Sequence, residues 1–103
     1  MMKIDNFKEI LSKIENYGGN SPSYWGNALA GEVGEACNLI KKYERDGKDI
    51  TEELGLELAD IFNYLVLTAR YFYIDLEKAI FDKLEILEKR KKQRKEKLKE
   101  LLI

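Results

Sequence analysis

The feature that most constrains this chain is helical periodicity with few breaks. One proline and seven glycines interrupt 103 residues, and the segments between the breaks carry apolar residues three or four positions apart. Such spacing places apolar side chains along one face of an α-helix. It predicts four helices, over about residues 4–16, 22–45, 52–73 and from 76 onward. No segment alternates as a strand does, so we predict an all-α four-helix bundle formed by one domain spanning residues 1–103.

Local signals predict where these helices begin. Ser21 before Pro22 is typical of a helix start, because the hydroxyl can accept from a free N–H and proline has no N–H to leave unpaired. The run Asp46-Gly47-Lys48-Asp49 predicts a turn. Thr51 and Asp75 are predicted to cap the third and fourth helices.

The third predicted helix is apolar over most of its circumference. Its polar members Glu53, Glu57, Asp60 and Asn63 fall within an arc of about 120° at 100° per residue. A helix of this kind is buried on several sides, and a chain this short has little surface with which to cover it, so we expect an oligomer. On the neighbouring helices we expect these side chains to face inward: Trp25, Leu29, Val33, Ala36, Ile40, Leu76, Ile80, Phe81, Leu84 and Leu87.

Composition excludes several kinds of chemistry. The chain has no histidine and a single cysteine, Cys37. Ser-His-Asp and Cys-His nucleophiles and His-ligated zinc are therefore excluded, and an internal disulfide cannot form. No apolar run of about 18 residues and no basic-then-apolar leader occurs, so we expect a cytoplasmic protein without a membrane segment. Any chemistry must come from carboxylates, Lys and Arg, hydroxyls or a hard metal ion.

Charge is unevenly distributed along the chain. Residues 1–88 carry 10 Lys and Arg against 17 Asp and Glu, whereas residues 89–103 carry 8 against 2. A basic block of this kind can contact nucleic acid. It has no aromatic residue on which a base could stack, and Leu98, Leu101 and Leu102 follow at helical spacing. We therefore interpret residues 89–103 as a solvated helical extension that packs on another subunit, with nucleic-acid binding as the alternative.

Two pairs of carboxylates stand out. Glu32 and Glu35 are three positions apart on the second predicted helix, and Glu57 and Asp60 are three apart on the third. Residues at this spacing have Cβ atoms about 5–6 Å apart, and antiparallel helices pack about 8–10 Å apart. Glu35 and Glu57 lie at similar distances from the predicted turn. Both pairs are therefore expected to share one pocket.

Each of these carboxylates alone is typical of a solvated helix face, but four together between apolar helices repel one another. Such a cluster persists when a cation neutralises it. Without histidine or a second thiol the ligands are all oxygen, which favours Mg²⁺, with Mn²⁺ possible, over zinc. Hard cations held by carboxylates usually serve phosphate chemistry.

Further side chains are candidates for contacting a phosphorylated substrate. Lys83 and Arg90 share one face of the fourth helix and could hold phosphates, with Arg70 a weaker candidate. An ordinary ion pair with a nearby acid such as Asp82 is the alternative for Lys83. Trp25 and Tyr24, with Asn63, could form a base pocket, although Trp25 also fits a purely structural place in the core.

The run from Trp25 to Glu35, Trp-Gly-Asn-Ala-Leu-Ala-Gly-Glu-Val-Gly-Glu, followed by Glu57-Leu-Ala-Asp60, resembles the MazG-like all-α nucleoside triphosphate pyrophosphohydrolases. Their signature is E-x-x-E, a short spacer, then E-x-x-D, and the resemblance covers about residues 22–90. It implies a Mg²⁺-dependent dimer or tetramer that hydrolyses a nucleoside triphosphate to the monophosphate and pyrophosphate by water attack on the α-phosphorus. It also implies that Glu32, Glu35, Glu57 and Asp60 bind the metal, with one of them acting as general base.

Members of this family often carry K-x-x-x-N-x-x-R on the last helix. Lys83 and Arg90 match this pattern, but Leu87 stands where Asn is common, which leaves the preferred base and sugar open. Three alternatives remain: a non-catalytic helical interaction module, a nucleic-acid accessory protein, and a phosphoribosyl-ATP-type pyrophosphohydrolase.

Overall fold

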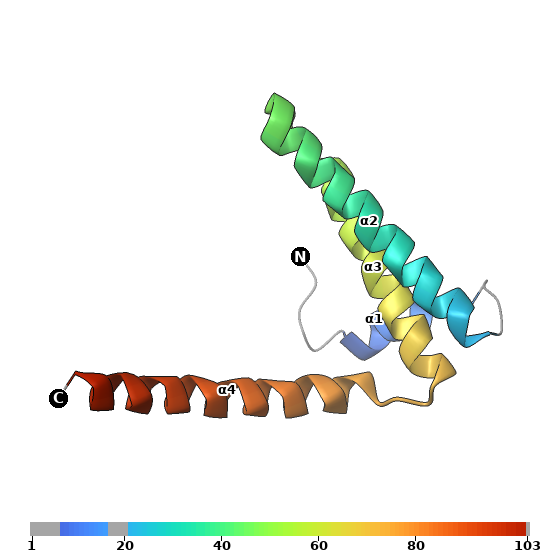
Figure 1. Ribbon diagram of the computed structural model, residues 1–103. Helices are drawn as coiled ribbons and strands as arrows, with labels where there is room; N and C mark the ends of the chain where they lie inside the picture. The colour runs from blue at the N-terminus through green and yellow to red at the C-terminus, as the bar shows by residue number, and fades with distance from the viewer. Residues whose placement is uncertain (1–6, 17–20, 103) are drawn as a thin grey trace. The chain divides into compact units, whose positions relative to one another are not determined.

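The computed structural model describes residues 7–16 and 21–102, and every regular element among them is a helix (Figure 1). The helices are α1 (Phe7–Lys13), α2 (Pro22–Asp46), α3 (Thr51–Tyr71) and α4 (Leu76–Leu101). The predicted all-α class with four helices is thereby confirmed. The chain divides into two compact units, Met1–Tyr73 and Ile74–Ile103, and each is described by itself. None of the helices in the described part is long and apolar enough to cross a bilayer.

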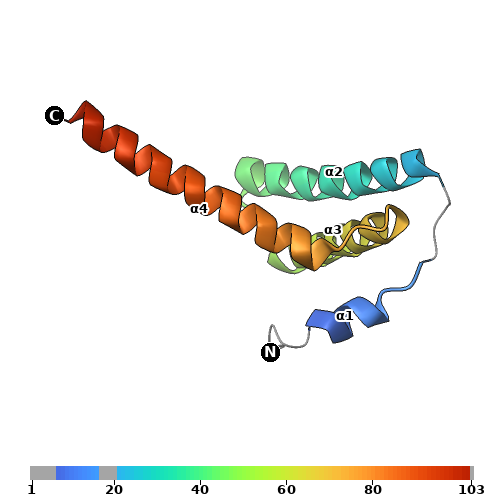
Figure 2. The same cartoon turned by 90° about the horizontal axis from the view of Figure 1, so that it is seen from below.

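Helices α2 and α3 form an antiparallel hairpin, and both views show them side by side (Figures 1 and 2). The Ser21 hydroxyl accepts a hydrogen bond from the Tyr24 N–H at 3.2 Å, which confirms the predicted start of α2. Gly47 ends α2 in the left-handed conformation, with φ 67°, and donates its N–H to the Tyr43 carbonyl. Glycine adopts this conformation without a steric penalty, so the chain reverses within a few residues.

The start of α3 differs from the prediction. Thr51 is the first residue of the helix, and it donates both its N–H and its hydroxyl to the carboxylate of Asp49, at 3.0 and 2.8 Å. The prediction of Thr51 as the cap is therefore wrong. An acceptor two residues upstream satisfies the backbone instead, as Asp commonly does in turns.

The core lies between α2 and α3. Its buried side chains are Trp25, Ala36, Ile50, Val66, Leu67 and Ala69. Trp25 is 0% exposed, and its ring centroid lies 6.4 Å from that of Tyr64 and 6.2 Å from that of Tyr71. The single tryptophan thus packs the start of α2 against the end of α3.

Helix α1 is shorter than the predicted helix over residues 4–16. Residues 4–6 lie outside the described part of the chain, and the helix ends at Lys13. The Arg70 guanidinium donates to the carbonyls of Leu11 and Ile14, which satisfies acceptors at the end of α1. Together with the Phe7–Phe62 ring contact at 6.0 Å, this interaction ties α1 to α3.

Several residues expected to face inward are exposed. Val33 and Ile40 are 42% and 47% exposed, because the paired helices cover only part of each other's circumference. No residue of α4 is buried, and its exposed apolar residues include Ile80, Phe81, Leu84 and Leu87. The expected burial of these α4 side chains is therefore not found in the single chain. Their spacing predicts the helix correctly, but spacing alone does not show what covers a helix face.

Candidate metal centre

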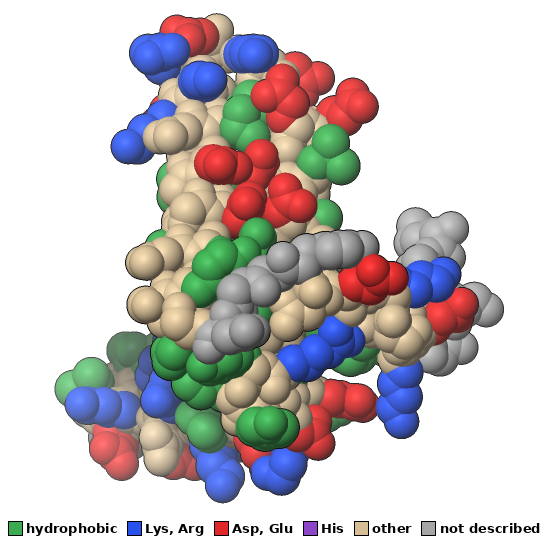
Figure 3. Space-filling view, turned by 90° about the vertical axis from the view of Figure 1, so that its right-hand side faces the viewer, with side chains coloured by type: hydrophobic (Ala, Val, Ile, Leu, Met, Phe, Trp, Pro, Cys, Tyr) green, Lys and Arg blue, Asp and Glu red, His purple; other side chains and the backbone are tan. Residues whose placement is uncertain are grey.

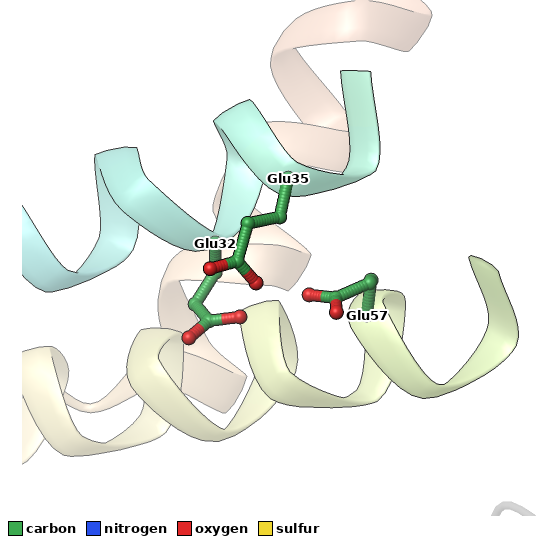
Figure 4. A group of neighbouring side chains, drawn as sticks. All are labelled: Glu32, Glu35 and Glu57. Carbon is green, nitrogen blue, oxygen red and sulfur yellow. The ribbon is translucent and has the colours of Figure 1, made fainter. Parts of the chain in front are cut away.

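Three carboxylates from the two hairpin helices converge on one point. Glu32 and Glu35 project from α2 and Glu57 from α3, and Figure 4 shows their carboxylates turned toward one another. One oxygen from each residue lies within 4.8 Å of the corresponding oxygens of the other two. We call Glu32, Glu35 and Glu57 the carboxylate triad.

Local structure explains why these residues meet. Glu32 and Glu35 stand about one helical turn apart on the same face of α2. The short connection between Asp46 and Thr51 then returns the chain antiparallel, which brings Glu57 level with them. Figure 3 shows acidic side chains gathered on one face of this hairpin.

Two oxygens of the triad are removed from water. Glu32 Oε2 and Glu57 Oε2 are buried and have no hydrogen-bond partner in the part of the chain that the structure describes. Leaving a buried acceptor unpaired costs about 1–3 kcal/mol, and more when the group is charged. A ligand that supplies positive charge at this point would remove that penalty.

The raised pKa values of two triad residues also favour a bound cation. Removal from water, followed by the close carboxylates of Glu35 and Glu32, raises the pKa of Glu57 to about 7. Removal from water is also the largest reason that the pKa of Glu32 is raised, and the negative charges of Glu35 and Asp60 add to it. Carboxylates that resist ionisation together release their protons when a cation binds, because the cation favours their charged form.

Asp60 lies beside the triad and not within it. Its side chain is exposed, one helical turn after Glu57 on α3. Its charge is close enough to raise the pKa of Glu32. The structure therefore gathers three of the four predicted carboxylates into one cluster and leaves the fourth at its edge.

The candidate substrate-binding residues are placed less uniformly. Asn63 is exposed on α3, while Lys83 and Arg90 are exposed on α4 in the second unit. Trp25 is completely buried, and this favours its core role over stacking on a base. Tyr24, which packs edge-on against Trp25 at 5.0 Å, is 36% exposed. Arg70 is engaged with carbonyls of Leu11 and Ile14, which makes it a structural residue.

Two side chains near the triad escaped the sequence analysis. Tyr64 lies one turn beyond Asp60, and its pKa is raised by a hydrogen bond with Tyr24, then by burial and by the charges of Glu32 and Asp60. Its position four residues after Asp60 was the available signal. Lys42 lines a hollow of about 380 Å³ that it shares with Glu35 and Glu57, and its position seven residues after Glu35 was the corresponding signal.

Comparison with known proteins identifies a family to which most of the chain is similar. The model of a family described as the MazG nucleotide pyrophosphohydrolase domain matches residues 20–95. The matched segment contains the whole hairpin, the carboxylate triad and Asp60. No curated protein and no solved structure matches the chain significantly.

Proposed function

The chain belongs to the MazG nucleotide pyrophosphohydrolase family, and from this membership we propose that it hydrolyses nucleoside triphosphates to the monophosphate and pyrophosphate. The observation that carries the proposal is the carboxylate triad. Three acidic side chains meet within 4.8 Å, in the matched part of the chain, with two buried oxygens that nothing in the described chain neutralises.

The donor set fits a hard divalent cation. All candidate ligands are carboxylate oxygens, which suit Mg²⁺ and Mn²⁺ and lack the nitrogen and sulfur donors that zinc usually takes. We propose that Glu32, Glu35 and Glu57 hold Mg²⁺, with Mn²⁺ as a substitute, and that Asp60 completes the ligand set. When bound, such a cation lowers the pKa of water and screens the charge of phosphate oxygens.

The chain's own residues then have distinct tasks. Water adds to the α-phosphorus, its proton passes to one of the four carboxylates, and the bond to the bridging oxygen breaks so that its electrons leave with pyrophosphate. Lys83 and Arg90 are proposed to hold the β- and γ-phosphates as charge-assisted donors. Asn63, exposed on the polar face of α3, is proposed to hydrogen-bond the base or sugar.

We also propose that the protein works as a homo-oligomer, a dimer or a tetramer. The exposed apolar side chains of α4 would gain burial from a second copy, and each fully buried side chain of this kind contributes about 1.5–3 kcal/mol. The nucleotide substrates and the free thiol of Cys37 are compatible with a cytoplasmic location.

The direct test is release of pyrophosphate from a panel of nucleoside triphosphates, canonical and oxidised, with and without Mg²⁺. Phosphoribosyl-ATP belongs in the panel because its hydrolysis would indicate the alternative activity. We expect Mg²⁺-dependent release from at least one member of the panel, and its loss in Glu57→Gln. The matched control is Glu52→Gln, which alters an exposed carboxylate on the same helix outside the triad. Normal activity in Glu57→Gln would refute the site.

A further inference from the structure

The positive charges of the first unit are largely committed to other groups. Seven Lys and Arg side chains lie in the described part of this unit. Lys13 pairs with Glu9, Arg45 with Asp46 and Lys48 with Glu53, at 3.7, 2.7 and 3.7 Å. Arg70 donates to the carbonyls of Leu11 and Ile14, at and just after the end of α1. The remaining three are Lys8, Lys41 and Lys42, none of which has an ion-pair partner among the described residues.

Of these three lysines, Lys42 lines a hollow that two residues of the carboxylate triad also line. It lines a hollow of about 380 Å³ together with Glu35 and Glu57 of the triad, and Asn38 and Glu53 also line it. Glu35, Asn38 and Lys42 follow one another at spacings of three and four on α2, so they share one helix face. We call this space the Lys42 hollow. Lys41, which is adjacent to Lys42 in the sequence, does not line the hollow.

The position of Lys42 is unusual because a cation shares a pocket with three carboxylates yet pairs with none of them. Because Lys42 forms no ion pair with a described residue, its ammonium group is free to pair with an anion bound in the hollow that it lines. A nucleoside triphosphate brings several negative charges, and a Lys ammonium binds phosphate oxygens as a point charge with three donors.

We propose that Lys42 binds the phosphate chain of the nucleotide substrate, from the side of the carboxylate triad nearest the α2–α3 turn. This inference rests on the proposed pyrophosphohydrolase function and assigns it a further substrate-binding residue. Lys42 belongs to the hairpin itself, so this contact is made by the same rigid helix that carries Glu32 and Glu35.

The test compares Lys42→Ala with Lys41→Ala, which removes the adjacent exposed lysine. Hydrolysis is measured at saturating Mg²⁺ with the best substrate of the nucleotide panel, and inhibition is measured with inorganic tripolyphosphate, which has neither base nor sugar. We expect Lys42→Ala to raise KM about tenfold, as loss of one charge-assisted contact does, with little change in kcat. The inhibition constant of tripolyphosphate should rise by the same factor. Lys41→Ala should match the wild type, and Lys42→Arg should retain most of the affinity.

Three results would overturn the proposal. Equal KM values in Lys42→Ala and Lys41→Ala would show that Lys42 does not contact substrate. A raised KM with unchanged tripolyphosphate inhibition would place Lys42 against the base or sugar. A change confined to the Mg²⁺ concentration required would show that Lys42 acts on the metal site.

Measurements on the wild-type protein distinguish failure of the proposed hydrolytic function from failure of the Lys42 proposal. If the wild-type protein releases pyrophosphate from no nucleotide, calorimetric binding of tripolyphosphate in the presence of Mg²⁺ still compares the variants. Weaker binding by Lys42→Ala than by Lys41→Ala would then support the phosphate contact without the hydrolytic activity. Equal binding, or none, would overturn it.

Discussion

Glu35 and Glu57 are separated by 21 intervening residues, yet their carboxylate oxygens lie within 4.8 Å of each other across the α2–α3 hairpin. Glu32 joins them from the same face of α2 as Glu35.

A divalent cation should stabilise the fold. Mg²⁺ binds the folded triad and has no comparable site in the unfolded chain, so at about 100 times its Kd it adds about 2.7 kcal/mol to the free energy of unfolding. Thermal melts with Mg²⁺ and with EDTA measure the effect. Glu57→Gln should lose most of the Mg²⁺-dependent rise in Tm, and Glu52→Gln should keep it. A rise of equal size in both variants would contradict a site at the triad.

Stability without metal should fall as the pH rises from about 4.5 to about 7. The folded-state pKa of Glu57 is raised from 4.5 to about 7, so the folded state holds a proton that the unfolded state has released in this window. The stabilising contribution of this proton is complete below the unfolded-state pKa of Glu57. It is lost as the pH rises through the folded-state pKa. Melts in EDTA across this range should therefore show a negative slope that is smaller in Glu57→Gln. An unchanged slope in the variant would show that Glu57 titrates normally.

Asp60→Asn should impair hydrolysis less than Glu57→Gln does. Asp60 lies at the edge of the triad, where its substitution removes one charge without opening the cluster. Although Asp60 is proposed as the fourth ligand, it lies outside the triad, so we expect its loss to cost about 10–100-fold in activity or metal affinity, the range typical of groups that support a metal site from its edge. Steady-state kinetics over a range of Mg²⁺ concentrations measures both quantities. A loss in Asp60→Asn as large as that in Glu57→Gln would indicate that the two residues ligate the metal equally.

Trp25 should matter for stability and not for base recognition. Its ring is 0% exposed between α2 and α3, and truncation of a buried aromatic to Ala costs about 3–5 kcal/mol. Chemical denaturation of Trp25→Ala measures this loss. Trp25→Phe retains a ring in the core, so its nucleotide preference should match that of the wild type. A changed preference in Trp25→Phe would support contact with the base.

The basic end of α4 should be dispensable for hydrolysis. Lys95, Lys97 and Lys99 are exposed, and the sequence around them contains no aromatic residue to stack a base. Changing all three to Gln should leave pyrophosphate release unchanged. Binding to DNA and RNA, measured at two salt concentrations, tests the alternative, because loss of phosphate contacts weakens binding and flattens its salt dependence.

The carboxylate cluster was predictable because it depends on local rules. Spacing of three residues fixes Glu32 against Glu35, and a short turn fixes the height of Glu57 opposite them. The place of Arg70 was not predictable in the same way, since its partners Leu11 and Ile14 lie 59 and 56 residues earlier in the chain. Periodicity shows which side of a helix a residue occupies but not which distant segment meets it.

Burial was predicted less well than helix position. The pattern on α4 gave the correct helix, but the residues on its apolar face, such as Ile80 and Leu84, are exposed in the single chain. Lys42 was overlooked for a related reason. The K-x-x-x-N-x-x-R pattern points to cations on the fourth helix, whereas the hollow beside Glu35 forms only where α2 and α3 pack together.

Gly47, which ends α2 in the left-handed conformation, lies in the turn that joins the two helices carrying the triad. Glu35 and Glu57 project from the two helices that this turn joins, so we expect metal affinity to depend on the geometry of the turn as well as on the ligands. A substitution at Gly47, such as Gly47→Ala, would strain the turn and weaken cation binding without altering any ligand. Titration of this variant with Mg²⁺ would thus measure how much the turn contributes to cation binding.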